Sequence, residues 1–252
     1  MGGFDGKTAI VTGASRGIGR ATALKLAAAG CSVFLAADGT VEELEDAVRE
    51  IRDGGGSAEF AIADLSGESA AEAMVEAALA AFGRIDILVN NAGIRIRRPF
   101  GAFTHEDFDT LVAVNLRAAF FASQAVLPAM RAAGGGRIVH VASQMGMVAS
   151  ETLALYGMAK AALIHLARSM ALELAPENIV VNAVSPGPIA TEFNLERWRQ
   201  EPERHARVLA KIPAGRTGKA DEVASAILFL ASADATFING HNLVIDGGYI
   251  IH

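Results

Sequence analysis

One stretch near the start of the chain decides its fold: Thr8-Ala9-Ile10-Val11-Thr12-Gly13-Ala14-Ser15-Arg16-Gly17-Ile18-Gly19. Its first residues are apolar or β-branched and predict a short strand, and the segment from Ala21 to Ala29 predicts a helix behind the glycines. Glycines at such a junction let the backbone approach a pyrophosphate, whose charge meets the free amides and the dipole at the helix start. The spacing Thr-Gly-x-x-x-Gly-x-Gly therefore favours a dinucleotide site over a glycine turn without a ligand. The predicted members of this site are Gly13, Ser15, Arg16, Gly17, Ile18 and Gly19.

The rest of the chain continues the alternation of short apolar runs with longer periodic segments. Further strands are predicted at 32–36, 58–62, 87–90, 136–141, 179–184 and 242–245, and further helices at 41–51, 68–82, 104–131, 153–174 and 220–231. Strands that form continuous apolar runs are buried on both faces, which is typical of a parallel sheet. We therefore expect an α/β fold: a Rossmann-type doubly wound parallel sheet of about seven strands, with helices on both faces, in a single domain over residues 1–252.

The composition limits the classes of function. The chain has 252 residues, is 52% hydrophobic and carries a formal charge of −6, so we expect no nucleic-acid partner, because binding phosphates needs a basic surface. Cys31 is the only cysteine, which excludes an internal disulfide and fits a reducing compartment. The start of the chain lacks an apolar signal core, and the longest apolar stretch, Leu26 to Ala37, is shorter than the roughly 18 residues of a membrane span. We expect a cytoplasmic protein without a membrane partner.

A segment between two predicted elements breaks the alternation. Residues 186–218 contain four of the seven prolines and are rich in Arg and Glu. Irregular segments of that length are usually functional or mobile. We interpret residues 187–218 as a partly helical flap over a substrate pocket, and the alternative is a plain surface excursion.

Ser143, Tyr156 and Lys160 can together support a proton-coupled hydride transfer. On a helix, Tyr156 and Lys160 stand one turn apart on one face. A free phenol has a pKa of about 10, and a neighbouring ammonium lowers it, so Lys160 would make Tyr156 a usable acid and base near neutrality. Ser143 follows a predicted strand and would polarise the carbonyl being reduced. An ordinary surface pair at helical spacing is the alternative for Tyr156 and Lys160 taken alone.

Further motifs in the same order point to a known family. Asn90-Asn91-Ala92-Gly93 ends a predicted strand, where open α/β sheets bind ligands. With the glycine loop, Asn115, the three residues above and Pro186-Gly187, the chain resembles the short-chain dehydrogenase/reductase family over nearly its whole length. Within it, the chain resembles the branch of the 3-oxoacyl-carrier-protein reductases, whereas enoyl reductases have a wider spacing from Tyr to Lys.

The resemblance implies a role for each matching residue. Tyr156 would be the general acid and base, Lys160 would lower its pKa and hold the nicotinamide ribose, Ser143 would orient the substrate oxygen, and Asn115 would support a proton path through water. Asp64, followed by Leu65, matches the acid that contacts adenine. The other cofactor-binding positions implied are Ala37, Asp38, Asn91, Ala92, Gly93, Pro186, Gly187, Ile189 and Thr191.

The choice between NAD and NADP depends on the end of the second strand. Members of the family that use NAD tend to carry an acid there, which binds the ribose hydroxyls and repels a 2′-phosphate. Ala37 matches that position and Asp38 follows it, whereas Arg16 resembles a basic residue of some NADP enzymes. We expect NAD or NADP, with NAD favoured.

The sequence indicates a substrate pocket but no particular compound. Ser143, Gln144, Met145, Phe193 and Trp198 fall on segments that would border it, which indicates a partly apolar site for a small alcohol or ketone. The nearby Arg95, Arg97 and Arg98 could attract an anionic substrate, since arginine suits carboxylates, but we favour solvated charges or inter-subunit contacts.

We expect an enzyme that interconverts a secondary alcohol and a ketone with NAD or NADP. The alternatives are a 3-oxoacyl-carrier-protein reductase and a non-catalytic dinucleotide-binding protein. Many 3-oxoacyl-carrier-protein reductases carry a basic residue at the position of Leu172, which weakens the first alternative. The six histidines show no spacing of metal ligands, so we expect no metal. Broad apolar helix faces, and the common state of the family, indicate a homotetramer or a homodimer.

Overall fold

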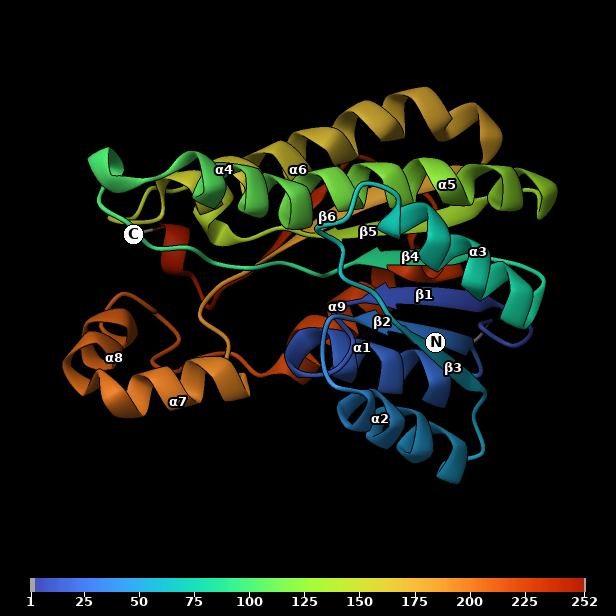
Figure 1. Ribbon diagram of the computed structural model, residues 1–252, viewed down its shortest axis with the longest axis horizontal. Helices are drawn as coiled ribbons and strands as arrows, with labels where there is room; N and C mark the ends of the chain where they lie inside the picture. The colour runs from blue at the N-terminus through green and yellow to red at the C-terminus, as the bar shows by residue number, and fades with distance from the viewer. Residues whose placement is uncertain (1–2, 252) are drawn as a thin grey trace.

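The computed structural model describes residues 3–251 and contains a seven-stranded sheet whose strands all run parallel (Figure 1). The strands are β1 (Thr8–Thr12), β2 (Ser32–Ala37), β3 (Ala58–Ile62), β4 (Ile87–Asn90), β5 (Gly136–Val141), β6 (Ile179–Pro186) and β7 (Asn242–Ile245). Their order is β3-β2-β1-β4-β5-β6-β7, so the direction of winding reverses between β1 and β4. At such a point the loops after neighbouring strands diverge and leave a crevice at the carboxyl ends. The predicted doubly wound sheet is confirmed.

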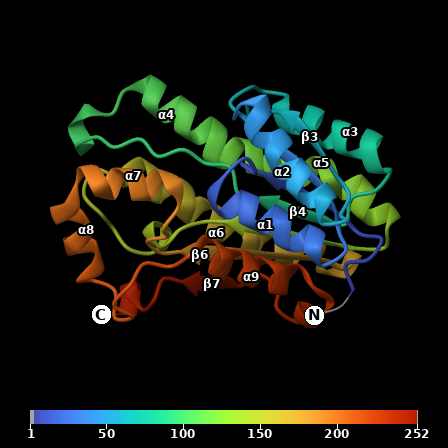
Figure 2. The ribbon, with the colours of Figure 1, turned by 90° about the horizontal axis from the view of Figure 1, so that it is seen from below.

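Helices cover both faces of this sheet (Figures 1 and 2). One layer contains α1 (Gly17–Ala28), α2 (Val41–Asp53) and α9 (Ala220–Ala231), and the other contains α3 (Ala70–Phe82), α5 (Ala118–Ala132) and α6 (Ala154–Leu174). Along β1, Ala9 and Val11 pack into the core of the first layer and Ile10 packs into the core of the second. A strand covered on both faces has no polar side to maintain, which explains the continuous apolar runs of the sequence.

The helical stretch predicted over 104–131 is confirmed as His105–Ala132, but it is not α-helical throughout. Between α4 (His105–Val112) and α5 the backbone forms a π-helical turn, Ala113–Arg117, which contains Asn115. A π turn inserts an extra residue, and such insertions often occur at functional sites. Here the turn brings Asn115 beside the loop that follows β4, as described below.

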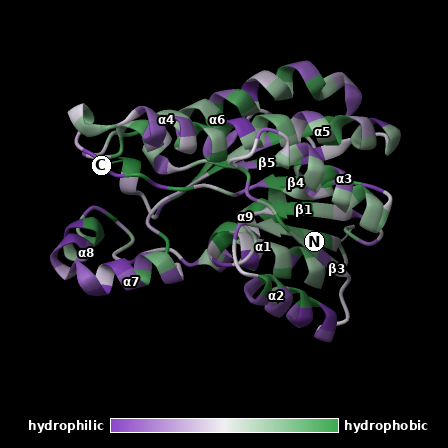
Figure 3. Ribbon diagram, viewed as in Figure 1, coloured by the Kyte–Doolittle hydropathy of each residue, from purple (hydrophilic) through white to green (hydrophobic). Residues whose placement is uncertain are grey.

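Between β6 and α9 the chain leaves the sheet and forms two helices, α7 (Glu192–Gln200) and α8 (Pro202–Leu209), which stand apart from the helical layers (Figure 1). They are largely hydrophilic, in contrast to the strands (Figure 3). Both ends of the segment are fastened by backbone hydrogen bonds: the amide of Ala190 donates to Gly218 at 2.8 Å, and the amide of Ala214 donates to Gly247 at 3.0 Å. The segment is therefore held at its ends beside the carboxyl edge of the sheet.

Within the described residues, one helical stretch, His105–Ala132, has the length and apolar composition that a membrane span would need. Nearly half of its most apolar window is buried inside the protein. Ala122, Val126 and Met130 of α5 belong to the core of the second layer. Packing against the sheet thus accounts for the apolar character of this stretch.

Candidate active site

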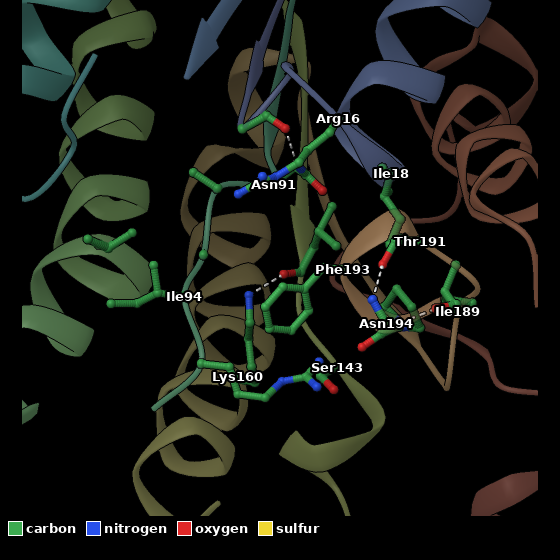
Figure 4. A pocket seen from close by; sticks show the side chains of 18 of the residues that line it. Arg16, Ile18, Asn91, Ile94, Ser143, Lys160, Ile189, Thr191, Phe193 and Asn194 are labelled. Carbon is green, nitrogen blue, oxygen red and sulfur yellow. Dashed lines mark hydrogen bonds between the residues drawn. The ribbon is translucent and has the colours of Figure 1, made fainter. Parts of the chain in front are cut away.

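A cleft with a volume of about 470 Å³ opens at the carboxyl ends of the strands, where the winding reverses (Figure 4). Arg16 and Asn91 lie at one end of it, and Ser143 and Lys160 lie at the other (Figure 4). Most of the predicted cofactor-binding residues line this cleft: Gly13, Ser15, Arg16, Gly17, Ile18, Asp38, Leu65, Asn91, Ala92, Gly93, Tyr156, Lys160, Pro186, Gly187, Ile189 and Thr191. The topology therefore gathers into one cleft residues that are far apart in the sequence.

The glycine loop after β1 has the shape needed to hold a pyrophosphate. Gly13 has φ +63°, a conformation that favours glycine, and a Cβ on it would lie 2.9 Å from Nδ2 of Asn91. The first turn of α1 contains no acid and its N-cap residue, Arg16, makes no capping hydrogen bond, so the amides at the helix start are available to an anion. A dinucleotide phosphate fits a backbone cradle with exposed donors of this kind.

Gly19, Ala37 and Asp64 lie outside the cleft wall. A Cβ on Gly19 would lie 2.1 Å from the carbonyl oxygen of Gly13, so this residue allows α1 to pack against the loop. Ala37 is 3% exposed and packs in the core, and the next residue, Asp38, is the one that reaches the cleft. The carboxylate of Asp64 accepts a hydrogen bond from the amide of Ser66 at 2.9 Å. Gly19 and Ala37 therefore affect the shape of the cleft through packing and do not line it.

The loop after β4 is fastened to the end of β1. Oγ1 of Thr12 accepts hydrogen bonds from the amides of Asn91 and Ala92, both at 2.9 Å, and Nδ2 of Asn91 donates to the carbonyl of Thr12 at 2.9 Å. Asn90 points the other way, into the core, where its Nδ2 lies 3.2 Å from Nδ1 of His140. Burial and the charge of Lys160 lower the pKa of His140 to about 4, so this histidine is neutral near pH 7.

Tyr156 and Lys160 lie on one face of α6, and both are buried. Nζ of Lys160 donates to the carbonyl of Val141 at 2.8 Å and stands 5.8 Å from the centre of the Tyr156 ring. Ser143, two residues after Val141, lines the same cleft, and its Oγ accepts a hydrogen bond from the amide of Met145 at 3.1 Å. The end of β5 and the first turns of α6 thus bring a hydroxyl, a phenol and an ammonium to one end of the cleft.

The electrostatic environment favours the phenolate of Tyr156. Burial alone would raise the pKa of the phenol. The charges of Lys160 and Arg95 and the hydroxyl of Ser143 lower it, and the pKa lies below its ordinary value of about 10. Burial also lowers the pKa of Lys160, and Arg95 adds to that effect. A phenol with a lowered pKa takes part in proton transfer more readily than a free phenol does.

Asn115 lies behind this group, outside the cleft wall. Its Oδ1 accepts from the amide of Ile94 at 2.8 Å, and its Nδ2 donates to the carbonyl of Ile94 at 3.0 Å. A Cβ on Gly93 would lie 3.3 Å from Nζ of Lys160 and 3.5 Å from Oδ1 of Asn115, so these three residues are close neighbours. Asn115 thus fixes the path of the loop that borders the cleft.

The predicted substrate residues are divided between two locations. Ser143 and Phe193 line the cleft, and Phe193 is 56% exposed. Gln144 and Met145 lie outside the cleft wall: Gln144 is 3% exposed, and Met145 packs against the apolar cluster that contains Tyr156. Trp198 is not among the residues that line the cleft, and its ring stacks on His205 with the ring centres 4.5 Å apart. The pattern of apolar residues could not distinguish a side chain that packs from one that faces the cleft.

Arg95 is the cleft residue that sequence reasoning undervalued. Its Cζ stands 5.3 Å from the centre of the Tyr156 ring, and its side chain lines the cleft. Arg95 is exposed, as our favoured interpretation of a solvated charge expects, but it also lines the cleft, which is the position that the anionic-substrate alternative needs. The available signal was its place two residues after Gly93, because the loops after strands form the cleft in open α/β sheets.

Comparisons with known proteins agree with this geometry. Residues 13–250 match the family described as Enoyl-(Acyl carrier protein) reductase. The chain is 36% identical to the 2-dehydro-3-deoxy-D-gluconate 5-dehydrogenase of Escherichia coli strain K12 over 248 residues, covering 98% of this chain and 96% of the relative. It is 40% identical to the 3-oxoacyl-[acyl-carrier-protein] reductase of the same organism over 245 residues, covering 97% and 98%.

A solved structure is also similar. The 3-oxoacyl (acyl-carrier-protein) reductase of Agrobacterium tumefaciens C58, with NADP bound, has a TM-score of 0.93 and 35% identity, and the match covers 98% of this chain and 95% of that one. The chain therefore belongs to the short-chain dehydrogenase/reductase family and is an NAD(P)-dependent oxidoreductase that acts on CH–OH groups.

Proposed function

We propose that Tyr156 is the general acid and base with which this chain interconverts a small secondary alcohol and a ketone. The observation that carries the proposal is the position of a buried phenol in the cleft, beside an ammonium and a guanidinium that lower its pKa. Lys160 stabilises the phenolate, Ser143 orients the substrate oxygen, and Asn115 fixes the loop that borders them. A non-catalytic dinucleotide-binding protein would have no need to hold these groups together.

Bound nicotinamide supplies or accepts the hydride. In the direction of reduction, the hydroxyl of Ser143 donates a hydrogen bond to the carbonyl oxygen, and the phenol of Tyr156 gives that oxygen its proton. The positive charge of Lys160 stabilises the phenolate that remains. In the direction of oxidation, the phenolate takes the proton of the alcohol. The residues of the glycine loop and of the segments after β4 and β6 would hold the dinucleotide along the rest of the cleft.

NAD is the cofactor that the cleft favours in this proposal. Asp38 follows β2 directly and lines the cleft, where a carboxylate can bind ribose hydroxyls and repel a 2′-phosphate. Arg16, which also lines the cleft, is the group that would support NADP instead. The NADP bound in the similar reductase supports use of either cofactor.

Subunit assembly and location complete the proposal. Phe120 and Phe121 of α5 are 41% and 37% exposed, and Leu172 and Phe237 are almost fully exposed. Exposed apolar side chains of this size support a homotetramer or a homodimer. We place the enzyme in the cytoplasm, where the single thiol, Cys31, would stay reduced.

The test of the catalytic assignment compares the two tyrosines of the chain, Tyr156 and Tyr249. Tyr156→Phe removes only the phenol oxygen, so we expect kcat to fall by about 10²-fold or more while the Kd of NADH, measured by fluorescence titration, is retained. Tyr249→Phe makes the same change outside the cleft wall and should retain kcat. Equal rates in the wild type and in Tyr156→Phe would contradict the assignment.

The 3-oxoacyl-carrier-protein alternative is tested with the same enzyme preparations. Leu172, on the outer face of α6, is 84% exposed and offers no charge to an acidic carrier protein. We therefore expect acetoacetyl thioesters to be reduced no better when they are attached to a carrier protein than when they are attached to a small thiol.

A further inference from the structure

Arg95 places a positive charge at the end of the cleft where Tyr156 lies. It belongs to the loop after β4, is exposed to solvent, and lines the cleft together with Ser143 and Tyr156. Its guanidinium carbon stands 5.3 Å from the centre of the Tyr156 ring. A solute that reacts at Tyr156 must therefore pass next to this charge.

Within the described residues, the charge of Arg95 has no acidic partner. Among residues 3–251, no aspartate or glutamate forms an ion pair with it. Arg98, three residues further along the same loop, differs: its Nε lies 3.2 Å from Oδ2 of Asp107, and it lies outside the cleft wall. The acids that line the cleft, Asp38 and Glu192, belong to the segment after β2 and to the start of α7 and leave Arg95 unpaired.

The surroundings of Arg95 are also positive. Lys160 also stands near the Tyr156 ring, with its Nζ 5.8 Å from the ring centre. Arg97, two residues beyond Arg95, is partly buried, and burial together with the charges of Arg197, Arg204 and Arg95 lowers its pKa to about 10. Arg95 and Lys160 both line the cleft, and two positive charges at one end of a cleft raise the local concentration of anions there.

The chemistry and the distances identify the anion. A guanidinium binds a carboxylate through two parallel hydrogen bonds with N···O distances of about 2.7–2.9 Å. The reacting oxygen must in turn come within about 2.6–3.2 Å of the phenol oxygen of Tyr156. Because Arg95 stands against the ring of that tyrosine, the two groups of the substrate must be separated by only a few bonds.

We propose that the substrate is a small hydroxy or oxo acid and that Arg95 binds its carboxylate, which makes Arg95 the residue that determines substrate class. The proposal rests on the proposed function, since it needs Tyr156 to be the place of reaction. In reduction, the carbonyl carbon gains a hydride from NADH or NADPH, the carbonyl oxygen gains a proton from Tyr156, and the carboxylate is unchanged. Neutral ketones and thioesters would lack the contact with Arg95.

The test uses acids and their neutral esters as matched substrates. The probes are 4-oxopentanoate and 5-oxohexanoate, each compared with its methyl ester, and kcat/KM is measured for the wild type, Arg95→Met, Arg95→Lys and Arg98→Met. We expect the wild type to prefer the acids. A hydrogen-bonded charge pair contributes about 1.5–3 kcal/mol, so Arg95→Met should lower the ratio of acid to ester by about 10- to 10²-fold, mainly through the KM of the acid.

The other variants separate charge recognition from a structural effect. Arg95→Lys keeps the charge and should restore part of the preference for the acid over the ester. Arg98→Met removes a charge from the same loop and should leave that preference at its wild-type value. The proposal is overturned if the wild type turns over the esters as well as the acids, if neither acid is turned over, or if the ratio survives in Arg95→Met. A wrong proposed function would give a different result: Tyr156→Phe would then reduce the probes at the wild-type rate, whatever the ratio of kcat/KM for the acid to that for the ester.

Discussion

Lys160 combines two tasks that would conflict on an exposed helix. It is buried, which lowers its own pKa, and it remains useful to Tyr156 only while it is charged. The carbonyl of Val141 accepts a hydrogen bond from its Nζ at 2.8 Å, and the phenolate that it stabilises raises its pKa in return. Phenol and ammonium therefore support each other's charged forms, and removing either changes the titration of the other.

Asp38 gives a prediction about the cofactor. In Asp38→Asn the repulsion of a 2′-phosphate disappears while the side chain keeps its size, so the ratio of kcat/KM for NADH to that for NADPH should fall by about 10-fold or more. Steady-state rates with both cofactors measure this ratio. Glu42→Gln is the matched control, because Glu42 is an exposed acid at the start of α2 and lies outside the cleft wall. A wild type that strongly prefers NADPH would contradict the role given to Asp38.

At the scale of elements, the contact between the glycine loop and α1 depends on Gly19. A Cβ there would lie 2.1 Å from the backbone oxygen of Gly13, so Gly19→Ala must move the loop or the helix. We expect about 1–3 kcal/mol of lost stability in thermal unfolding and a clearly raised Kd for NADH, because the same loop forms the phosphate cradle.

Gly101→Ala is the control for that substitution. Gly101 has an ordinary φ and no atom within 4 Å of its added Cβ, so stability and the Kd of NADH should remain at their wild-type values. Unchanged cofactor binding in Gly19→Ala would show that the loop tolerates a shift and that the cradle is formed elsewhere.

The elements that the sequence predicted well are those with a local signal. The strands β3, β4, β5 and β7 have the expected bounds. β4 and β5 are buried parallel strands and form continuous apolar runs, and the partly exposed edge strands β3 and β7 are short, mainly apolar runs bounded by polar residues or glycine. The π turn at Ala113–Arg117 has no such signal, since its extra residue is stabilised by contacts of Asn115 with Ile94, about twenty positions away. Long-range contacts of this kind cannot be found from periodicity.

The residues of the site also divide into those with a local signal in the sequence and those that depend on long-range contacts. The glycine loop and the pair of Tyr156 and Lys160 could be predicted because each lies within one element or one junction. The position of Arg95 over the Tyr156 ring, and the stacking of Trp198 on His205, depend on how a loop or two flap helices run in space. A sequence pattern contains no information on such paths.

At the scale of the whole molecule, the exposed phenylalanines of α5 predict an assembly. Phe120 and Phe121 lie next to each other with their ring centres 5.4 Å apart, and neither is buried within the chain. We expect sedimentation velocity to show a tetramer or a dimer at micromolar concentration, and smaller species after Phe120→Glu and Phe121→Glu together. Val41→Glu, on the far helical layer, adds a charge elsewhere and should leave the assembly intact. A monomeric wild type would contradict the prediction.

The pH dependence of alcohol oxidation tests most directly the central claim, that Tyr156 is a base whose pKa the neighbouring cations lower. Oxidation needs the phenolate, so at saturating cofactor kcat/KM should rise with pH and level off above the pKa of Tyr156, with its midpoint below pH 10. Replacing Lys160 by Met removes a cation, raises that pKa, and should move the rise to higher pH. A wild-type midpoint at or above pH 10, or a profile that Lys160→Met does not move, would contradict the account.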